Sequence, residues 1–182
     1  MSNYNPFNWY WLAEDGRIFS SAVQAIVPAT NPGYVAFIEA TAPTPWPRDD
    51  NGNQTSDELG KVLAPYGMFS DLTSYAADRR WRAEIGGIEV GGMPVATDDR
   101  SKQMILGARI AADADATFVT RWAVGDQTFA LNAEQIIAIS NAVLAHVNAC
   151  FVAFSTLAAA ISATPPTVTT RAQITTAFAA IQ

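Results

Sequence analysis

The sequence predicts an α+β fold that is mainly helical, and three patterns predict it. Apolar residues recur with alternating spacings of three and four over residues 132–163, as on one face of a long helix. Asp-Gly and Gly-Gly pairs lie between short apolar stretches, which is typical of hairpin turns. Capping residues followed three positions later by Glu or Gln mark the starts of further helices. Helices separated by small hairpins are therefore expected.

Residues 1–68 are predicted to form a small, aromatic-rich module of hairpins and helices. Asp15-Gly16 predicts the turn of a hairpin, and Ala25-Ile26-Val27-Pro28 predicts a further extended segment. At Asn31-Pro32 a capping residue precedes a proline at the first helical position. A short helix through Phe37 should therefore follow.

A stiff loop, a second helix and a connecting helix are expected next. Three prolines make the run Pro43-Thr44-Pro45-Trp46-Pro47 a stiff loop. Thr55 with Glu58 three residues later is the pattern of a capping box and predicts a helix start. Residues 69–85 place apolar side chains at helical spacing among charged ones, which predicts a helix that connects two modules.

Residues 86–163 are predicted to form a second module built from two hairpin–helix units. The first hairpin turns at Gly91-Gly92, and Thr97 or Asp98 caps the helix that follows it. The second hairpin turns at Gly125-Asp126 and leads into the long helix, for which Asn132 is the predicted N-cap.

Residues 164–182 are predicted to form a short C-terminal helix. Thr170 with Gln173 marks its start, and Ile174, Phe178 and Ile181 form one apolar stripe along it. Such a stripe needs cover, so we expect this helix to fold back on the long helix or to pack on a neighbouring molecule.

The long helix carries an apolar seam and, after Glu134, no charged residue. The seam consists of Ile136, Ser140, Val143, Val147, Cys150, Phe154, Leu157 and Ile161. Apolar residues also flank this seam, and no Asp, Glu, Lys or Arg occurs between residues 135 and 170. The helix must therefore be covered on more than one side. Either the chain's own fold covers it, or three or more copies of the helix pack around an axis.

Composition favours a protein that works through contacts with other proteins. Only 15% of the residues are charged, which suits a chain that is buried in an assembly. The net charge of −6 gives no electrostatic basis for binding nucleic acid. A membrane span is not expected either, because polar residues interrupt the long helix at Asn141, His146, Asn148, Ser155 and Thr156.

Two pairs of residues raise the question of catalysis or metal binding. His146 and Cys150 share one helix face, but a zinc site needs three or four ligands, and the chain has one His and one Cys. We expect Cys150 to fill the seam and His146 to pack or to form a hydrogen bond. Asp98 and Asp99 are adjacent at a helix start, where capping is the favoured interpretation and a calcium site the alternative.

Aromatic and seam residues are the candidate partner-binding residues. The aromatic residues near the N-terminus form either the core of the first module or an exposed docking patch, since aromatic side chains serve both purposes. The full set of candidates is Phe7, Trp9, Trp11, Trp46, Val147, Phe151, Phe154 and Phe178.

One block of sequence resembles a known family. The block is Gly92-Met93-Pro94-Val95-Ala96-Thr97-Asp98-Asp99-Arg100-Ser101, accompanied by Arg80-Trp81, Gly86-Gly87-Ile88, Gly107-Ala108-Arg109, Trp122 and residues 145–151. This part of the chain resembles a domain of unknown function found in tailed-phage and prophage proteins, whose members are commonly encoded beside tail and tail-fibre genes. Residues 10–12, 18–21 and 43–47 also resemble phage tail modules.

The resemblance implies a function without supplying catalytic residues. It implies a non-enzymatic component of the virion at the tail tip, baseplate or fibre-attachment region, present in the host cytoplasm during assembly. Its partners would be other tail or tail-fibre proteins, and the three-fold and six-fold symmetry of tails favours a trimer. The alternatives are a tail-fibre assembly chaperone that leaves the particle and, more remotely, a hydrolase of glycan or cell wall. No catalytic residue, cofactor or metal ligand is expected.

Overall fold

The computed structural model describes residues 4–181, and of Val124 it describes the backbone alone. Half of the chain is helical and 16% is in strands, which confirms an α+β, mainly helical fold. The chain divides into two compact units, Met1–Tyr75 and Ala76–Gln182, which are described separately below. Residues 1–3 and 182, which belong to the predicted N-terminal module and C-terminal helix, lie outside the described residues.

The first unit is built on a small sheet with the strand order β3-β2-β1-β4. Its strands are β1 (Tyr10–Leu12), β2 (Ile18–Ser20), β3 (Ala25–Val27) and β4 (Thr44–Pro45). The predicted hairpin at Asp15-Gly16 is confirmed, because it joins the antiparallel strands β1 and β2. The proline-rich run is not only a loop, since β4 pairs in parallel with β1. Pro45 is tolerated there because β4 is an edge strand.

The helices of the first unit begin where the capping patterns predict. α1 (Pro32–Ala40) starts after Asn31, whose side chain accepts a hydrogen bond from the Tyr34 backbone N–H. α2 (Ser56–Leu63) starts after Thr55, whose hydroxyl accepts one from the Glu58 N–H, and the 3-10 helix η1 (Ala64–Tyr66) follows it. α3 (Leu72–Glu84), the predicted connecting helix, begins in this unit and continues into the second.

Three tryptophans belong to the core of the first unit, which corrects the alternative of an exposed docking patch. Trp9, Trp11 and Trp46 are 8%, 2% and 2% exposed and pack with other buried side chains in one cluster. Their polar atoms are satisfied inside the unit. The Trp46 indole N–H donates to the Trp11 carbonyl oxygen at 3.1 Å, and the Trp9 indole N–H donates to the Thr44 hydroxyl at 2.8 Å. These side chains are therefore not available to a partner.

Two hairpin–helix units form the first part of the second unit, as predicted. The first consists of β5 (Ile88–Val90), β6 (Met93–Val95) and α4 (Asp99–Ala114). The second hairpin consists of β7 (Val119–Val124) and β8 (Gln127–Asn132) and is paired over six residues of each strand. Asp98 is the cap of α4, because its side chain accepts a hydrogen bond from the Ser101 N–H.

The long helix and the C-terminal helix also have their predicted starts. α5 (Ala133–Ser162) has a complete capping box, in which Asn132 and Gln135 each accept a hydrogen bond from the other's backbone N–H at 2.9 and 3.0 Å. α6 (Arg171–Ala179) has the same arrangement between Thr170 and Gln173. Both capping predictions are confirmed.

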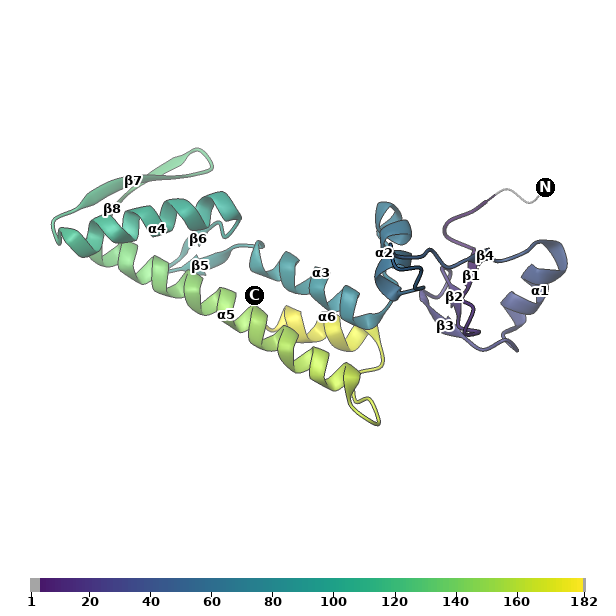
Figure 1. The fold of residues 1–182 in the computed structure, drawn as a ribbon. Coiled ribbons are helices and arrows are strands. Elements are labelled where there is room, and N and C mark those ends of the chain that lie inside the picture. The colour runs from purple at the N-terminus through teal and green to yellow at the C-terminus, as the bar shows by residue number, and fades with distance from the viewer. Residues whose placement is uncertain (1–3, 182) are drawn as a thin grey trace. The chain divides into compact units, whose positions relative to one another are not determined.

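α5 is the spine of the second unit (Figure 1). α4 packs along its first half, and β5 and β8 contact it as well. Its seam residues Ile136 and Val143 lie in a cluster with Val95 of β6, Ile105 of α4 and Leu131 of β8. α6 folds back on α5, as one of the two predicted alternatives states, and buries Ile174 and Phe178. The full burial of each such side chain contributes about 1.5–3 kcal/mol.

We predict that Asn132→Ala lowers the free energy of unfolding by about 1 kcal/mol, because it removes the acceptor of the capping box at the start of α5. Urea unfolding followed by far-UV circular dichroism measures this change. Asn148→Ala is the matched control. Asn148 is exposed in the middle of α5, where Ala has the higher helix propensity, so this variant should be neutral or slightly more stable. Equal loss in both variants would contradict the capping argument.

Candidate functional site

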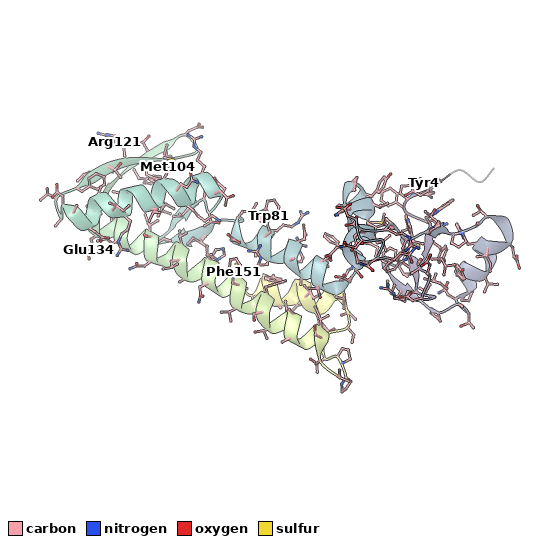
Figure 2. The ribbon with its side chains drawn as sticks, viewed as in Figure 1. Tyr4, Trp81, Met104, Arg121, Glu134 and Phe151 are labelled. Atoms are coloured by element: carbon pink, nitrogen blue, oxygen red, sulfur yellow. The ribbon has the colours of Figure 1, made fainter. Side chains whose placement is uncertain are left out.

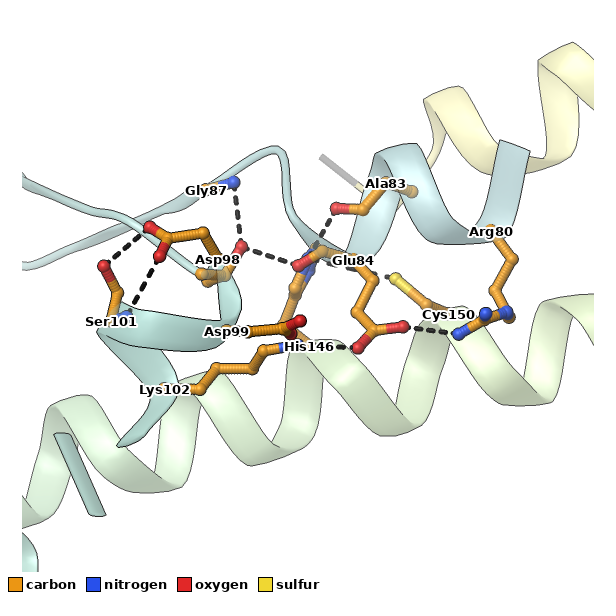
Figure 3. A network of polar contacts seen from close by, with 11 residues as sticks. Arg80, Ala83, Glu84, Gly87, Asp98, Asp99, Ser101, Lys102, His146 and Cys150 are labelled. Atoms are coloured by element: carbon orange, nitrogen blue, oxygen red, sulfur yellow. Dashed lines mark hydrogen bonds and ion pairs between the residues drawn. The ribbon is translucent and has the colours of Figure 1, made fainter. Parts of the chain in front are cut away.

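A network of polar contacts joins α3, α4 and α5 around Glu84, the last residue of α3 (Figure 3). The Glu84 carboxylate forms ion pairs with Arg80, one turn earlier on α3, and with Lys102 of α4. The Lys102 ammonium lies 2.8 Å from Glu84 and 3.0 Å from Asp99. Its hydrogen bond to Glu84 is the main reason why the pKa of Lys102 is raised. Glu84 thus holds the end of α3 to the first turn of α4.

Thr97 is the second member of this network and is completely buried. Its hydroxyl donates to the Glu84 carbonyl oxygen at 2.6 Å and accepts from the Gly87 N–H at 2.9 Å. The hydroxyl therefore satisfies a carbonyl at the end of α3 and an N–H just before β5. Sequence reasoning considered Thr97 only as a cap. The sequence did contain a signal for a different role. Thr97 directly precedes Asp98, and because only one of the two can cap α4, the other is left to form different contacts.

Asp98 and Asp99 have structural contacts. The Asp98 carboxylate accepts hydrogen bonds from the Ser101 N–H at 3.1 Å and from the Ser101 hydroxyl at 2.7 Å. These hydrogen bonds lower the pKa of Asp98. Asp99 is exposed and pairs with Lys102. Over residues 4–181 no three His, Cys, Asp or Glu side chains gather closely enough to hold a metal ion.

His146 and Cys150 lie inside the second unit. The His146 ring is buried, and its Nε2–H donates to the Ala83 carbonyl oxygen of α3 at 3.0 Å. The Cys150 Sγ lies 3.8 Å from the same nitrogen. Burial raises the pKa of the Cys150 thiol. A nucleophilic cysteine needs a lowered pKa and access to its substrate, so this pair acts as packing and as a tie between α3 and α5.

Arg80 links the network to the surface of α5. Its guanidinium lies over the Phe151 ring, 4.4 Å from the ring centroid. The Phe151 side chain stays 49% exposed. Figure 2 labels Phe151 on α5. The neighbouring Arg82 forms a surface ion pair with Asp78 at 2.8 Å. Arg80 differs from a surface residue, because it and Glu84 are both largely buried.

The other candidate residues of the second unit occupy three kinds of position. Val147 and Phe154 are partly buried. Phe178 is 4% exposed, so its assignment as a partner-binding residue is corrected by its packing within this unit. Phe151 is exposed, and Leu144 and Val152 of α5 are more exposed still, at 69% and 56%. Sequence reasoning did not select Leu144 or Val152, although both lie off the apolar seam.

Phe7 is the one predicted aromatic candidate of the first unit that is exposed among the residues described. Its side chain is 59% exposed and contacts the ring of Tyr66 edge-on, with ring centroids 6.0 Å apart.

An apolar hollow of about 410 Å³ lies where the first hairpin, β8 and the start of α5 meet. Its lining includes the turn at Gly91-Gly92 together with Met93, Phe129 and Ala138. With the exposed residues of α5, it leaves apolar surface of the second unit accessible.

Comparison with known proteins gives one match. Residues 70–181 match a family described as a domain of unknown function (DUF4376). No curated protein and no solved structure matches the chain. The matched range contains α3 and α6 in addition to the two hairpins, α4 and α5, so the whole packing around the Glu84 network lies within it.

We predict that Thr97→Val lowers the free energy of unfolding by about 2 kcal/mol, because it leaves the Glu84 carbonyl and the Gly87 N–H without a buried partner. Thr97→Ser keeps the hydroxyl and removes one methyl group, so its loss should be nearer about 1 kcal/mol. Chemical unfolding of the two variants measures the difference. A Val variant as stable as the wild type would show that these hydrogen bonds do not hold α3 to β5.

Proposed function

The chain belongs to the DUF4376 family of domains of unknown function, and on this premise we propose that it is a non-enzymatic structural component of a tailed-phage virion. Its place would be the tail tip, the baseplate or the fibre-attachment region. The support is the resemblance of residues 92–101 and their companions to a domain encoded beside tail and tail-fibre genes. In the structure these ten residues run from the turn of the first hairpin into the first turn of α4.

The observation that carries the proposal is the exposed, uncharged face of α5. Leu144, Phe151 and Val152 are exposed on a helix with no charged residue after Glu134. Aliphatic and aromatic side chains gathered on one exposed face are typical of protein–protein contacts. An enzyme would instead need reactive groups in an accessible cleft, and the buried contacts of His146 and Cys150 favour a structural role.

The same face favours assembly with further copies of the chain. The α5 side chains of this face carry no charge, and the Arg80 guanidinium over Phe151 is paired with Glu84, so two or more copies can bring the face together without repulsion between like charges. The seam of α5 is already covered by α4, the hairpins and α6, so self-assembly would use the exposed residues that lie beside this seam. We propose a homo-oligomer, with a trimer preferred for the symmetry of phage tails.

α5 is long and apolar enough to cross a membrane by length and composition. We propose that it is instead the core helix of its unit. Seven of its residues are buried, and His146 among them forms a hydrogen bond to α3. Asn132 and Gln135 form a capping box at its start, which places polar groups at the position where the hairpin joins it.

We expect the chain to be present in purified particles. Quantitative mass spectrometry of particles and of infected lysate measures its copy number relative to known tail proteins, and a multiple of three is the expected result for a trimer. A chain that is abundant in lysate but absent from particles would contradict the structural role. That result would support the assembly chaperone, which holds a fibre and then leaves.

We predict that the double variant Leu144→Asp, Val152→Asp dissociates the oligomer while its helical content is unchanged, because both side chains are exposed in the single chain. Size-exclusion chromatography with light scattering measures the mass, and circular dichroism measures the helix content. The double variant Leu106→Asp, Ile110→Asp is the matched control. Leu106 and Ile110 are 59% and 64% exposed on α4, so a comparable loss of apolar surface there should leave the mass unchanged.

Val147→Asp distinguishes self-assembly from folding. Val147 packs against the core cluster of the second unit, so a charge at this position should unfold that unit rather than separate copies. A wild-type chain that is a monomer at micromolar concentration would contradict the homo-oligomer.

A further inference from the structure

Two arginines of the second unit differ from the other basic residues of the chain. The chain has 11 Lys and Arg residues, all within the part that the structure describes. Nine of them, all but Arg100 and Arg121, have an ion pair or another contact. For Arg100 and Arg121 the described residues supply no side-chain partner. In an acidic protein with net charge −6, two arginines without a carboxylate partner are notable.

Both arginines line the same hollow. It has a volume of about 600 Å³, within the usual size range of ligand sites, and lies between the first turn of α4 and the β7–β8 hairpin. Arg100 comes from the first turn of α4 and Arg121 from β7, the next element along the chain. Figure 2 labels Met104 on α4 and Arg121 on β7, on the two elements that border this hollow.

The hollow also offers apolar surface to a ligand. Met104 and Trp122 both line it, and Met104 is 52% exposed. Trp122 packs at the same time against the core cluster of the second unit, so the core fixes the position of its ring. Arg, Trp and Met are residue types enriched where proteins bind one another.

The charges that line the hollow favour a ligand with a single negative group. Asp98 is the carboxylate among them, so Asp98, Arg100 and Arg121 together carry a charge of +1. The Asp98 oxygens already accept hydrogen bonds from Ser101 and leave the arginines without a pair. A carboxylate matches this balance, and an arginine guanidinium can bind one through two parallel hydrogen bonds. A polyanion such as nucleic acid would be repelled by Asp98 and by the net negative charge of the protein.

We propose that this hollow binds a segment of a partner protein in which one Asp or Glu stands next to a large apolar residue. The carboxylate pairs with Arg100 and Arg121, and the apolar side chain covers Met104 and Trp122. The proposal rests on the proposed function in taking the ligand to be a protein, and it names the chemistry that such a partner must present.

The test is a titration of the full-length chain followed by NMR. The probe is a Gly-Ser peptide that contains a single Leu-Glu-Phe segment. We expect shifts of the Arg100 and Arg121 Nε–Hε signals and of the Trp122 indole signal, while the Arg109 signal stays fixed. Arg109 is an internal reference because it lies on the same helix but pairs with Asp113. The Leu-Gln-Phe peptide lacks the charge and should bind at least about tenfold more weakly.

Variants assign the binding to the two arginines. Arg100→Gln and Arg121→Gln should each raise the dissociation constant about tenfold, since each removes a hydrogen bond to a charged group. Arg109→Gln changes the net charge equally and should have no effect. Met104→Ala should weaken binding of the Leu-Glu-Phe peptide but not that of a Ser-Glu-Ser peptide. Both arginines and Met104 are exposed, so these variants are expected to fold.

Several results would overturn the proposal. They are equal binding of the Gln peptide, equal weakening by Arg109→Gln, or no shift at the three signals. Inorganic phosphate or a single-stranded oligonucleotide that displaces the peptide and binds more tightly would also overturn it, in favour of a general anion site. None of these results depends on whether particles contain the chain. Failure here and failure of the proposed virion role are therefore distinguishable.

Discussion

The need to cover a helix of 30 residues that carries no charge after Glu134 governs the second unit. α5 cannot leave its apolar seam in water, because exposing that much apolar surface would cost more free energy than one domain has to spare. α4, both hairpins and α6 accordingly pack against it. The short hairpins have no core of their own and depend on this helix, since an isolated two-stranded hairpin is only marginally stable. The elements matched to the family are therefore elements that α5 organises.

Apolar packing alone does not determine how α3 is placed against α5, and a few polar contacts add that specificity. His146 donates a hydrogen bond to the Ala83 carbonyl, and the Thr97 hydroxyl donates one to the Glu84 carbonyl. The Lys102 ammonium donates to the Glu84 carboxylate. Each of these groups would be costly to bury without its partner. A shift of α3 along α5 would break these contacts together. The network thus has a clear structural use, and the same contacts occupy the groups that might otherwise suggest catalysis.

After these requirements are met, the second unit keeps two surfaces of different chemistry. One is the exposed face of α5, which carries no charged side chain of α5, combines Leu144, Phe151 and Val152 with the exposed polar residues Asn141, Asn148 and Ser155, and suits contact with an identical surface. The other is the hollow with Arg100 and Arg121, which suits an acidic ligand. A protein that assembles with copies of itself and also holds a different partner needs two such surfaces. The proposed place in a phage tail would use both.

The sequence by itself determined the elements and their starts, because capping, turn and periodicity signals act between residues that are close in the chain. Asn31, Asp98, Asn132 and Thr170 each cap the helix that follows them, and the glycine turns join the hairpins. Only the tertiary structure decided what these elements meet. It buried Trp9, Trp11, Trp46 and Phe178, paired the proline-rich run with β1, and brought Arg100 and Arg121 to one hollow. Such outcomes depend on contacts between distant segments, which a local pattern does not contain.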